Sequence, residues 1–154
     1  MNGRKPAESA SEMVQIVMPG QSNTHGNLFG GILMQWLDLV ASVAVKRHCR
    51  KVVVTASMDR LDFKASAKVG DIVVLKARVN RAFRTSMEAG VRVIVENLDT
   101  GDQRLIARCY MTYVALDEDG KPTEVPPIEP DTTEDHRRYK EAGIRRNKRL
   151  EGTC

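Results

Sequence analysis

The chain has 154 residues, of which 42% are hydrophobic, and a formal net charge of +4. This length supports one globular domain with a core, and no apolar run reaches the roughly 18 residues of a membrane-spanning helix. The three cysteines, Cys49, Cys109 and Cys154, are odd in number and lack CxxC spacing, which argues against a disulfide framework or a zinc site and favours a reducing cytoplasm.

The amino-terminal segment divides into two parts. Residues 1–12 are polar and are expected to form a disordered leader. Residues 13–18 form a short apolar run that Pro19 and Gly20 interrupt, which predicts an opening strand. The folded domain is therefore expected to span residues 13–117.

A polar, glycine-rich loop over residues 23–31 leads into an almost entirely apolar helix over residues 32–45. The only polar side chains of this helix are Gln35, Asp38 and Ser42, whose spacing places them in one narrow stripe. Such a helix is expected to be buried. An ionisable Asp within it must be paired, solvated through a cleft, or used in chemistry.

After residue 51 the apolar period changes from helical to two. Strands are predicted over residues 52–58, 73–79, 87–96 and 104–116, each with one apolar face. The long apolar helix is the natural cover for that face. The predicted fold is α+β: a curved antiparallel sheet around one central helix, with a second copy completing the wall around the helix.

The carboxyl-terminal part is expected to be peripheral. Residues 118–131 form a proline-rich connector, and Thr132 or Thr133 is predicted to cap a polar helix in the segment 132–154. Residues 137–149 hold seven Lys and Arg residues against Glu141 alone. This basic segment suits an anionic partner.

Few residues in the sequence are candidates for a catalytic role. No GxSxG, Walker or GxGxxG motif occurs, and no HxxxH pair is present. Gly30 and Gly31 at a helix start can offer backbone N–H groups to a phosphate or a carbonyl oxygen, or they can simply ease close packing. Asp38 is either a structural carboxylate, the safer interpretation from spacing alone, or a general base that activates water.

Three further segments carry two interpretations each. Asn23 either holds a water molecule or forms an Asx turn, and His25 either binds substrate or stands on an exposed loop. The run Arg84-Thr85-Ser86 either grips a phosphate or forms an ordinary polar hairpin. Residues 137–149 are by default a solvated helix face, and Tyr139 alone provides aromatic character for nucleic-acid binding.

The order and spacing of several motifs resemble those of the hotdog-fold acyl-CoA thioesterases, in the branch of the cytosolic and brain-type acyl-CoA hydrolases. The resemblance extends from about Met18 to Pro127. It lacks only the Pro that relatives usually carry after the Asp-Phe element. The motifs that carry it are Asn23-x2-Gly26-x3-Gly30-Gly31-x6-Asp38, Asp62-Phe63, Val69-Gly70-Asp71, Arg84-Thr85-Ser86-Met87 and Val114-Ala115-Leu116-Asp117-x2-Gly120-Lys121-Pro122.

The resemblance implies a fold, an assembly and a site. It implies a hotdog dimer formed by continuing the sheet, often in a trimer of dimers, with an active site shared between subunits. Asp38 would be the catalytic carboxylate, as general base or nucleophile, and Asn23 of the other subunit would face it. N–H groups near Gly30 and Gly31 would polarise the thioester. The segments expected to bind substrate contain His25, Arg84, Thr85, Ser86, Arg145, Arg146 and Lys148.

The expected function is hydrolysis of fatty acyl-CoA to free acid and coenzyme A without a metal or redox cofactor. A homo-oligomer, a dimer at least, is expected, with no nucleic-acid or membrane partner. The alternative is a non-catalytic acyl-CoA sensor of the same fold, which the presence of both Asn23 and Asp38 disfavours. Enoyl hydration or dehydration would require a catalytic His near the helix, and His25 leaves that alternative open.

Overall fold

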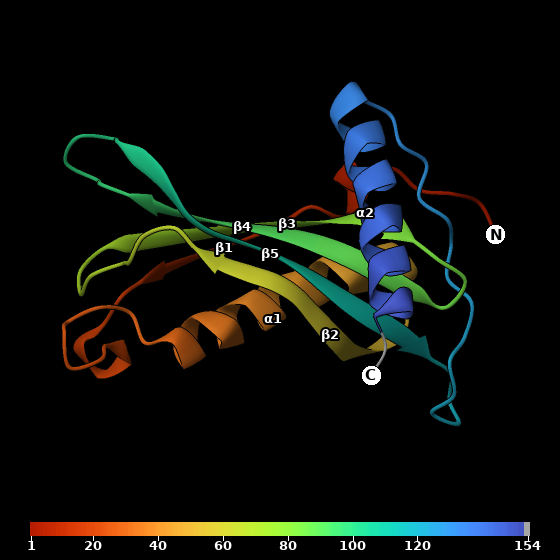
Figure 1. The fold of residues 1–154 in the computed structure, drawn as a ribbon, viewed down its shortest axis with the longest axis horizontal. Coiled ribbons are helices and arrows are strands. Elements are labelled where there is room, and N and C mark those ends of the chain that lie inside the picture. The colour runs from red at the N-terminus through yellow and green to blue at the C-terminus, as the bar shows by residue number, and fades with distance from the viewer. Residues whose placement is uncertain (153–154) are drawn as a thin grey trace.

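A computed structural model describes residues 1–152 of the chain (Figure 1). The end of the predicted carboxyl-terminal segment 132–154, with Cys154, lies outside the described residues. In chain order the elements are η1 (Pro6–Ser9), β1 (Ser11–Ile16), η2 (Pro19–Gln21), α1 (Gly30–Cys49), β2 (Val52–Phe63), β3 (Ile72–Ala82), β4 (Ser86–Glu96), β5 (Gln103–Leu116) and α2 (Thr133–Glu151).

The five strands form one antiparallel sheet in the order β1-β3-β4-β5-β2, which confirms the predicted α+β hotdog architecture. Alternate residues of the strands face opposite sides. Leu75 belongs to the core together with Leu37 of α1, whereas Arg78 pairs with Asp135 of α2. The two helices therefore cover opposite faces of the sheet (Figure 1).

The core lies between α1 and the inner face of the sheet. Burial of apolar surface stabilises a fold by roughly 25 cal/mol per Å², and one side of α1 supplies much of that surface here. The other side carries Met34, Leu39 and Val43, which are 47%, 49% and 43% exposed. The buried side chains of α1 are Leu33, Trp36, Leu37, Val40, Ala41, Ala44, Val45, His48 and Cys49.

Residues 1–12 differ from the disordered leader expected from their composition. Ser9 accepts a hydrogen bond from the backbone N–H of Val79 at 2.8 Å, and Ser11 donates to the carbonyl of Val40 at 2.7 Å. Arg4 donates to the carbonyl of His48 at 2.6 Å. These partners lie far along the chain, so local polarity could not reveal them. The segment joins the domain, and β1 begins at Ser11.

The remaining helices and strands lie near their predicted positions. The hydroxyl of Thr132 accepts from the backbone N–H of Asp135 at 3.0 Å, which is the predicted cap of α2. The opening strand, the helix and the four later strands all appear near their predicted positions, although β2 continues five residues past residue 58. Within residues 1–152, no helix has both the length and the apolarity that crossing a bilayer requires.

Candidate active site

Asp38 lies half-buried on α1, and two hydroxyl groups donate hydrogen bonds to its carboxylate. Tyr113 donates to Oδ1 at 2.7 Å, and Thr55 donates to the same oxygen at 2.8 Å. Oδ2 has no hydrogen-bond partner within residues 1–152. One oxygen is thus fixed and the other is open to a water molecule or a substrate.

The sheet register places both hydroxyls beneath Asp38. Thr55 of β2 and Tyr113 of β5 are direct cross-strand partners, so their side chains share one face. Tyr113 is buried. Burial raises the pKa of its hydroxyl well above the ordinary value, and the hydrogen bond to Asp38 raises it further. Tyr113 therefore stays protonated and acts as a donor to the carboxylate.

The sequence pattern singles out neither Thr55 nor Tyr113 as a partner of Asp38. Thr55 lies in the predicted strand over residues 52–58, and Tyr113 lies in the predicted strand over residues 104–116. Their convergence depends on which strands pair and in which register. The only local signal was a tyrosine on a core face, because a buried tyrosine hydroxyl usually requires a partner.

Asn23 organises the loop before α1 as an Asx turn. Its Oδ1 accepts from the backbone N–H groups of His25 at 2.9 Å and Asn27 at 3.2 Å. Gly26, at φ +76°, supplies the left-handed backbone that closes this turn. The side-chain amide Nδ2 of Asn23 has no protein partner among residues 1–152, so the turn leaves a donor free. His25 is exposed beside it.

Helix α1 begins at Gly30 without a side-chain cap. The carbonyl of Phe29 accepts from Ile32 and Leu33, and the N–H groups of Gly30 and Gly31 have no acceptor within the described chain. They carry the positive end of the helix dipole. A Cβ on Gly31 would lie 2.8 Å from the Phe29 ring, whereas one on Gly30 would meet nothing within 4 Å. Gly31 is thus also needed for packing.

The helix start and Asp38 of one chain are too far apart to act on one small group. Eight residues separate Gly30 from Asp38 on α1. At about 1.5 Å of rise per residue, this is about 12 Å. One subunit therefore presents a carboxylate and a cluster of free N–H donors at two separate places.

The hairpin with Arg84, Thr85 and Ser86 adjoins the carboxylate site. Ser86 pairs with Val114, the neighbour of Tyr113. The carbonyls of Arg84 and Thr85 accept from Val125 and Ala115, which fixes the backbone. The guanidinium of Arg84 is exposed and has no ion-pair partner in residues 1–152.

The basic residues predicted on α2 have different environments. Arg145 binds Glu88 of β4 through two hydrogen bonds of 2.7 and 2.9 Å and lies 3.5 Å from the Tyr110 ring centroid. Burial opposes the charge of Arg145, but the hydrogen bonds and charge of Glu88 hold its pKa above the ordinary value. Arg146 stacks on Phe83 at 4.7 Å, and Lys148 is exposed.

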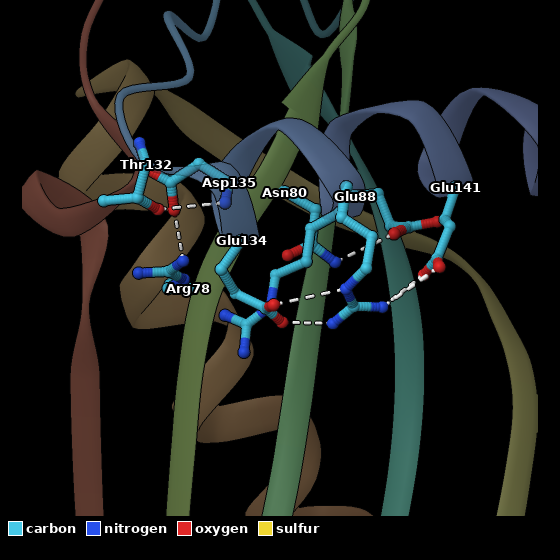
Figure 2. A network of polar contacts seen from close by, with 9 residues as sticks. Arg78, Asn80, Glu88, Thr132, Glu134, Asp135 and Glu141 are labelled. Atoms are coloured by element: carbon cyan, nitrogen blue, oxygen red, sulfur yellow. Dashed lines mark hydrogen bonds and ion pairs between the residues drawn. The ribbon is translucent and has the colours of Figure 1, made fainter.

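Figure 2 shows Glu88 and Asn80 together beneath α2, where Asn80 donates to Glu88 at 3.0 Å. Glu88 is 2% exposed. Its carboxylate is therefore fully engaged by Arg145 and Asn80, and Arg145 has a structural role in attaching α2 to the sheet.

A small apolar cavity of about 270 Å³ lies next to the start of α1. Its apolar lining includes Leu28, Leu33, Phe63 and Ile106. Among the described residues, no group of three or more His, Cys, Asp or Glu side chains is placed to hold a metal ion.

Comparison with known proteins gives consistent matches over most of the chain. Residues 25–101 match the thioesterase superfamily. The Bacillus subtilis protein named uncharacterized acyl-CoA thioester hydrolase YkhA is 44% identical over 142 residues, covering 92% of this chain and 83% of the relative. A hexameric acyl-CoA thioesterase superposes with a TM-score of 0.94 at 39% identity, covering 98% of this chain and 97% of the other.

An acyl-CoA hydrolase from Staphylococcus aureus is similar as well. Its complex with butyryl coenzyme A, coenzyme A and coenzyme A disulfide superposes with a TM-score of 0.91 at 34% identity, covering 96% of this chain and 90% of that one. Single Asp→Ala, Thr→Ala and Asn→Ala variants of that hydrolase have also been solved.

Proposed function

Because the chain belongs to the thioesterase superfamily, we propose that it hydrolyses fatty acyl-CoA to free fatty acid and coenzyme A with Asp38 as general base. The observation that carries this proposal is the arrangement of the Asp38 carboxylate. Tyr113 and Thr55 hold Oδ1, and this leaves Oδ2 to accept a proton. The reaction needs only water and side chains of the protein.

In the proposed mechanism, Oδ2 of Asp38 removes a proton from a bound water molecule. The water oxygen attacks the thioester carbonyl, and the negative charge develops on the carbonyl oxygen. Collapse of the tetrahedral intermediate breaks the C–S bond. Asp38 gives the proton that it removed from the water to the coenzyme A sulfur, and the acyl group leaves as the free acid.

The similar S. aureus hydrolase supports this choice of residues. Its altered Asn, Asp and Thr residues are separated by 15 and 17 positions, in that order. The same intervals separate Asn23, Asp38 and Thr55 here. The three variants of that hydrolase therefore have the same spacing as the loop amide, the helix carboxylate and the strand hydroxyl of this chain.

A second copy of the chain would supply the N–H donors for the thioester carbonyl beside Asp38. The N–H groups of Gly30 and Gly31 in one subunit would polarise the thioester carbonyl, and Asp38 of the other subunit would activate the water that attacks it. Asn23 of the first subunit would position the water or the carbonyl. Two features favour such pairing: the exposed Met34, Leu39 and Val43 on α1, and the edge strand β2 with exposed Val52, Val54 and Phe63. The hexameric relative favours a trimer of such dimers.

The two ends of the substrate call for different surfaces. The acyl chain would follow the apolar side chains of α1 and the cavity beside Leu33. The phosphates of coenzyme A would meet the exposed Arg84, with the hydroxyls of Thr85 and Ser86 and with Arg146 and Lys148 nearby. Cys49 and Cys109 are free and buried, in keeping with a cytoplasmic enzyme.

A thiol-release assay over acyl-CoA chain lengths tests the proposal directly. Wild-type protein should release coenzyme A catalytically, and Asp38→Asn should lose about 10²–10⁴-fold in rate. Saturable binding of acyl-CoA without turnover by wild-type protein would instead identify a sensor of the same fold. Single-turnover hydrolysis in ¹⁸O-labelled water tests the general base: label in Asp38 would reveal an acyl-enzyme and contradict it.

A further inference from the structure

The connector between β5 and α2, residues 118–131, is attached to the domain by its middle part. In Figure 1 it passes along one side of the domain from the end of β5 to the start of α2. Val125, Pro126 and Ile128 are buried within it. Each of residues 124–127 forms a hydrogen bond with a different residue elsewhere in the chain. The position of this stretch is therefore closely defined.

Two successive prolines determine how the connector can be held. Pro126 and Pro127 have no backbone N–H, so only their carbonyls can take part in hydrogen bonds. The carbonyl of Pro126 lies 2.6 Å from Nε2 of His48, and that of Pro127 accepts from the backbone N–H of Arg4 at 3.0 Å. Proline rings also fix φ and stiffen the backbone. A shift at Pro126 is therefore passed on to its neighbour Val125.

His48 lies in the last turn of α1 and is 1% exposed. Because the carbonyl of Pro126 can only accept, Nε2 of the imidazole carries the proton of this hydrogen bond. Nδ1 is buried without a hydrogen-bond partner among residues 1–152. An apolar side chain would fill the same space without leaving a buried polar atom unpaired. The imidazole therefore contributes one thing that an apolar residue cannot, the donor to Pro126.

The connector in turn holds the hairpin that contains Arg84. Val125 donates its backbone N–H to the carbonyl of Arg84 at 3.1 Å. The carbonyl of Thr85 instead accepts from Ala115 of β5 at 3.0 Å. The connector thus holds the backbone of Arg84, whereas β5 holds its neighbour. A displaced connector would move Arg84 first.

His48 is too far from the reacting atoms to act on them directly. Ten residues of α1 separate it from Asp38, which is about 15 Å at about 1.5 Å of rise per residue. Its side chain is also buried away from any substrate. An effect of His48 on the reaction must therefore pass through other residues, and its hydrogen bond leads through the connector to Arg84.

We propose that His48 is a positioning residue for the coenzyme A end of the substrate. Its hydrogen bond to Pro126 places Val125, and Val125 places Arg84 for contact with the phosphates. This role rests on the proposed function, in which Arg84 meets those phosphates and Asp38 activates water. Because Asp38 is not on this path, loss of the donor from His48 should raise KM and leave kcat nearly unchanged.

Steady-state hydrolysis of acyl-CoA by a matched pair of variants tests this role. His48→Met and His48→Gln introduce side chains of similar length, but only Gln offers an N–H donor to the carbonyl of Pro126. His48→Met should raise KM about three- to tenfold, the effect of one lost hydrogen bond. His48→Gln should restore most of the wild-type KM. Both variants should keep kcat within about twofold of wild type.

Lys51→Met perturbs the connector from its surface and keeps the test decisive if His48→Met fails to fold. The half-buried Lys51 donates from Nζ to the carbonyl of Glu124 at 2.6 Å, next to Val125. Its replacement should also raise KM. Lys46→Met is the matched control, because it removes an exposed cation from the same end of α1. The Lys46 side chain forms no hydrogen bond or ion pair within residues 1–152, so KM should equal that of wild type.

A double-mutant cycle with Arg84→Gln identifies the path. Arg84→Gln alone should raise KM, and adding His48→Met should then have little further effect, because both changes remove the same contact with substrate.

Three results would overturn the positioning role: a wild-type KM in both His48→Met and Lys51→Met, full additivity of His48→Met with Arg84→Gln, or a fall in kcat without a change in KM. A wild-type KM in Arg84→Gln, or no turnover by wild-type protein, would contradict the proposed function and this proposal with it.

Discussion

The hydroxyl of Tyr113 donates to two oxygens of Asp38: Oδ1 at 2.7 Å and the main-chain carbonyl at 3.0 Å. The buried side chain of Tyr113 on β5 therefore fixes both the backbone and the carboxylate of Asp38 on α1. This contact orients Oδ2 away from the sheet. Tyr113 therefore positions the proposed general base without contacting the substrate.

Tyr113→Phe should therefore lower kcat with little change in KM. A hydrogen bond to a charged group contributes about 1.5–3 kcal/mol, so a loss of about tenfold or more is expected. Steady-state kinetics with a saturating acyl-CoA measure it. Tyr110→Phe is the matched control, because Tyr110 lies on the outer face of β5. Equal kcat values for Tyr113→Phe and wild type would contradict the positioning role.

Gly30→Ala should separate activity from stability. A Cβ at Gly30 meets nothing within 4 Å of the chain, and Gly→Ala at a compatible site stabilises by about 0.4–1 kcal/mol. If the N–H groups at the helix start contact the thioester, the added methyl group obstructs that contact. We expect slower turnover with an equal or higher melting temperature; unchanged turnover would remove Gly30 from the site.

The sequence alone identified the fold because the two apolar periods are strong and local. The helix over 32–45 and the four alternating strands appear in the structure close to their predicted positions. The motif spacing from Asn23 to Asp38 pointed to the loop and the carboxylate. The apolar periods and the motif from Asn23 to Asp38 are both patterns of residues that lie close together in the sequence.

Long-range pairing explains what the sequence did not reveal. Thr55 and Tyr113 meet Asp38 only because β2 pairs with β5 in one register. Arg145 looked like a free cation on a basic helix, yet Glu88 of β4 binds it 57 residues away. Such partners leave no periodic signal in the chain.

The ion pair of Glu88 and Arg145 is expected to stabilise the attachment of α2. Arg145→Met would leave a buried carboxylate with Asn80 as its remaining side-chain partner, which typically costs about 3–5 kcal/mol. Glu88→Gln combined with Arg145→Met should recover much of that loss. Urea unfolding of the single and double variants measures it. A raised KM for acyl-CoA in Arg145→Met without any loss of stability would show a substrate-binding role instead.

Stability should fall in mild acid because of His48. Burial lowers the pKa of this imidazole, and the nearby Arg4 charge acts in the same direction. Nε2 lies 2.6 Å from the carbonyl of Pro126, and Nδ1 is buried without a hydrogen-bond partner among residues 1–152. The unfolded chain therefore binds the proton more readily than the folded one, so stability is complete above about pH 6.5 and declines as pH falls.

Urea unfolding between pH 5 and pH 7.5 tests this prediction. His48→Gln should show a flatter pH dependence than wild type, while the exposed His136→Gln should match wild type. The same slope in wild type and His48→Gln would mean that other groups cause the acid sensitivity.

Subunit complementation tests the central claim, that Asn23 and Asp38 of different subunits form one catalytic site. Asn23→Ala and Asp38→Ala proteins, each nearly inactive alone, are co-expressed or refolded together and assayed by coenzyme A release. If the residues act across the dimer, each hybrid dimer has one intact site, and random mixing restores about a quarter of wild-type activity. If both act within one chain, every site in the mixture carries a lesion, and the absence of any recovery would contradict the shared site.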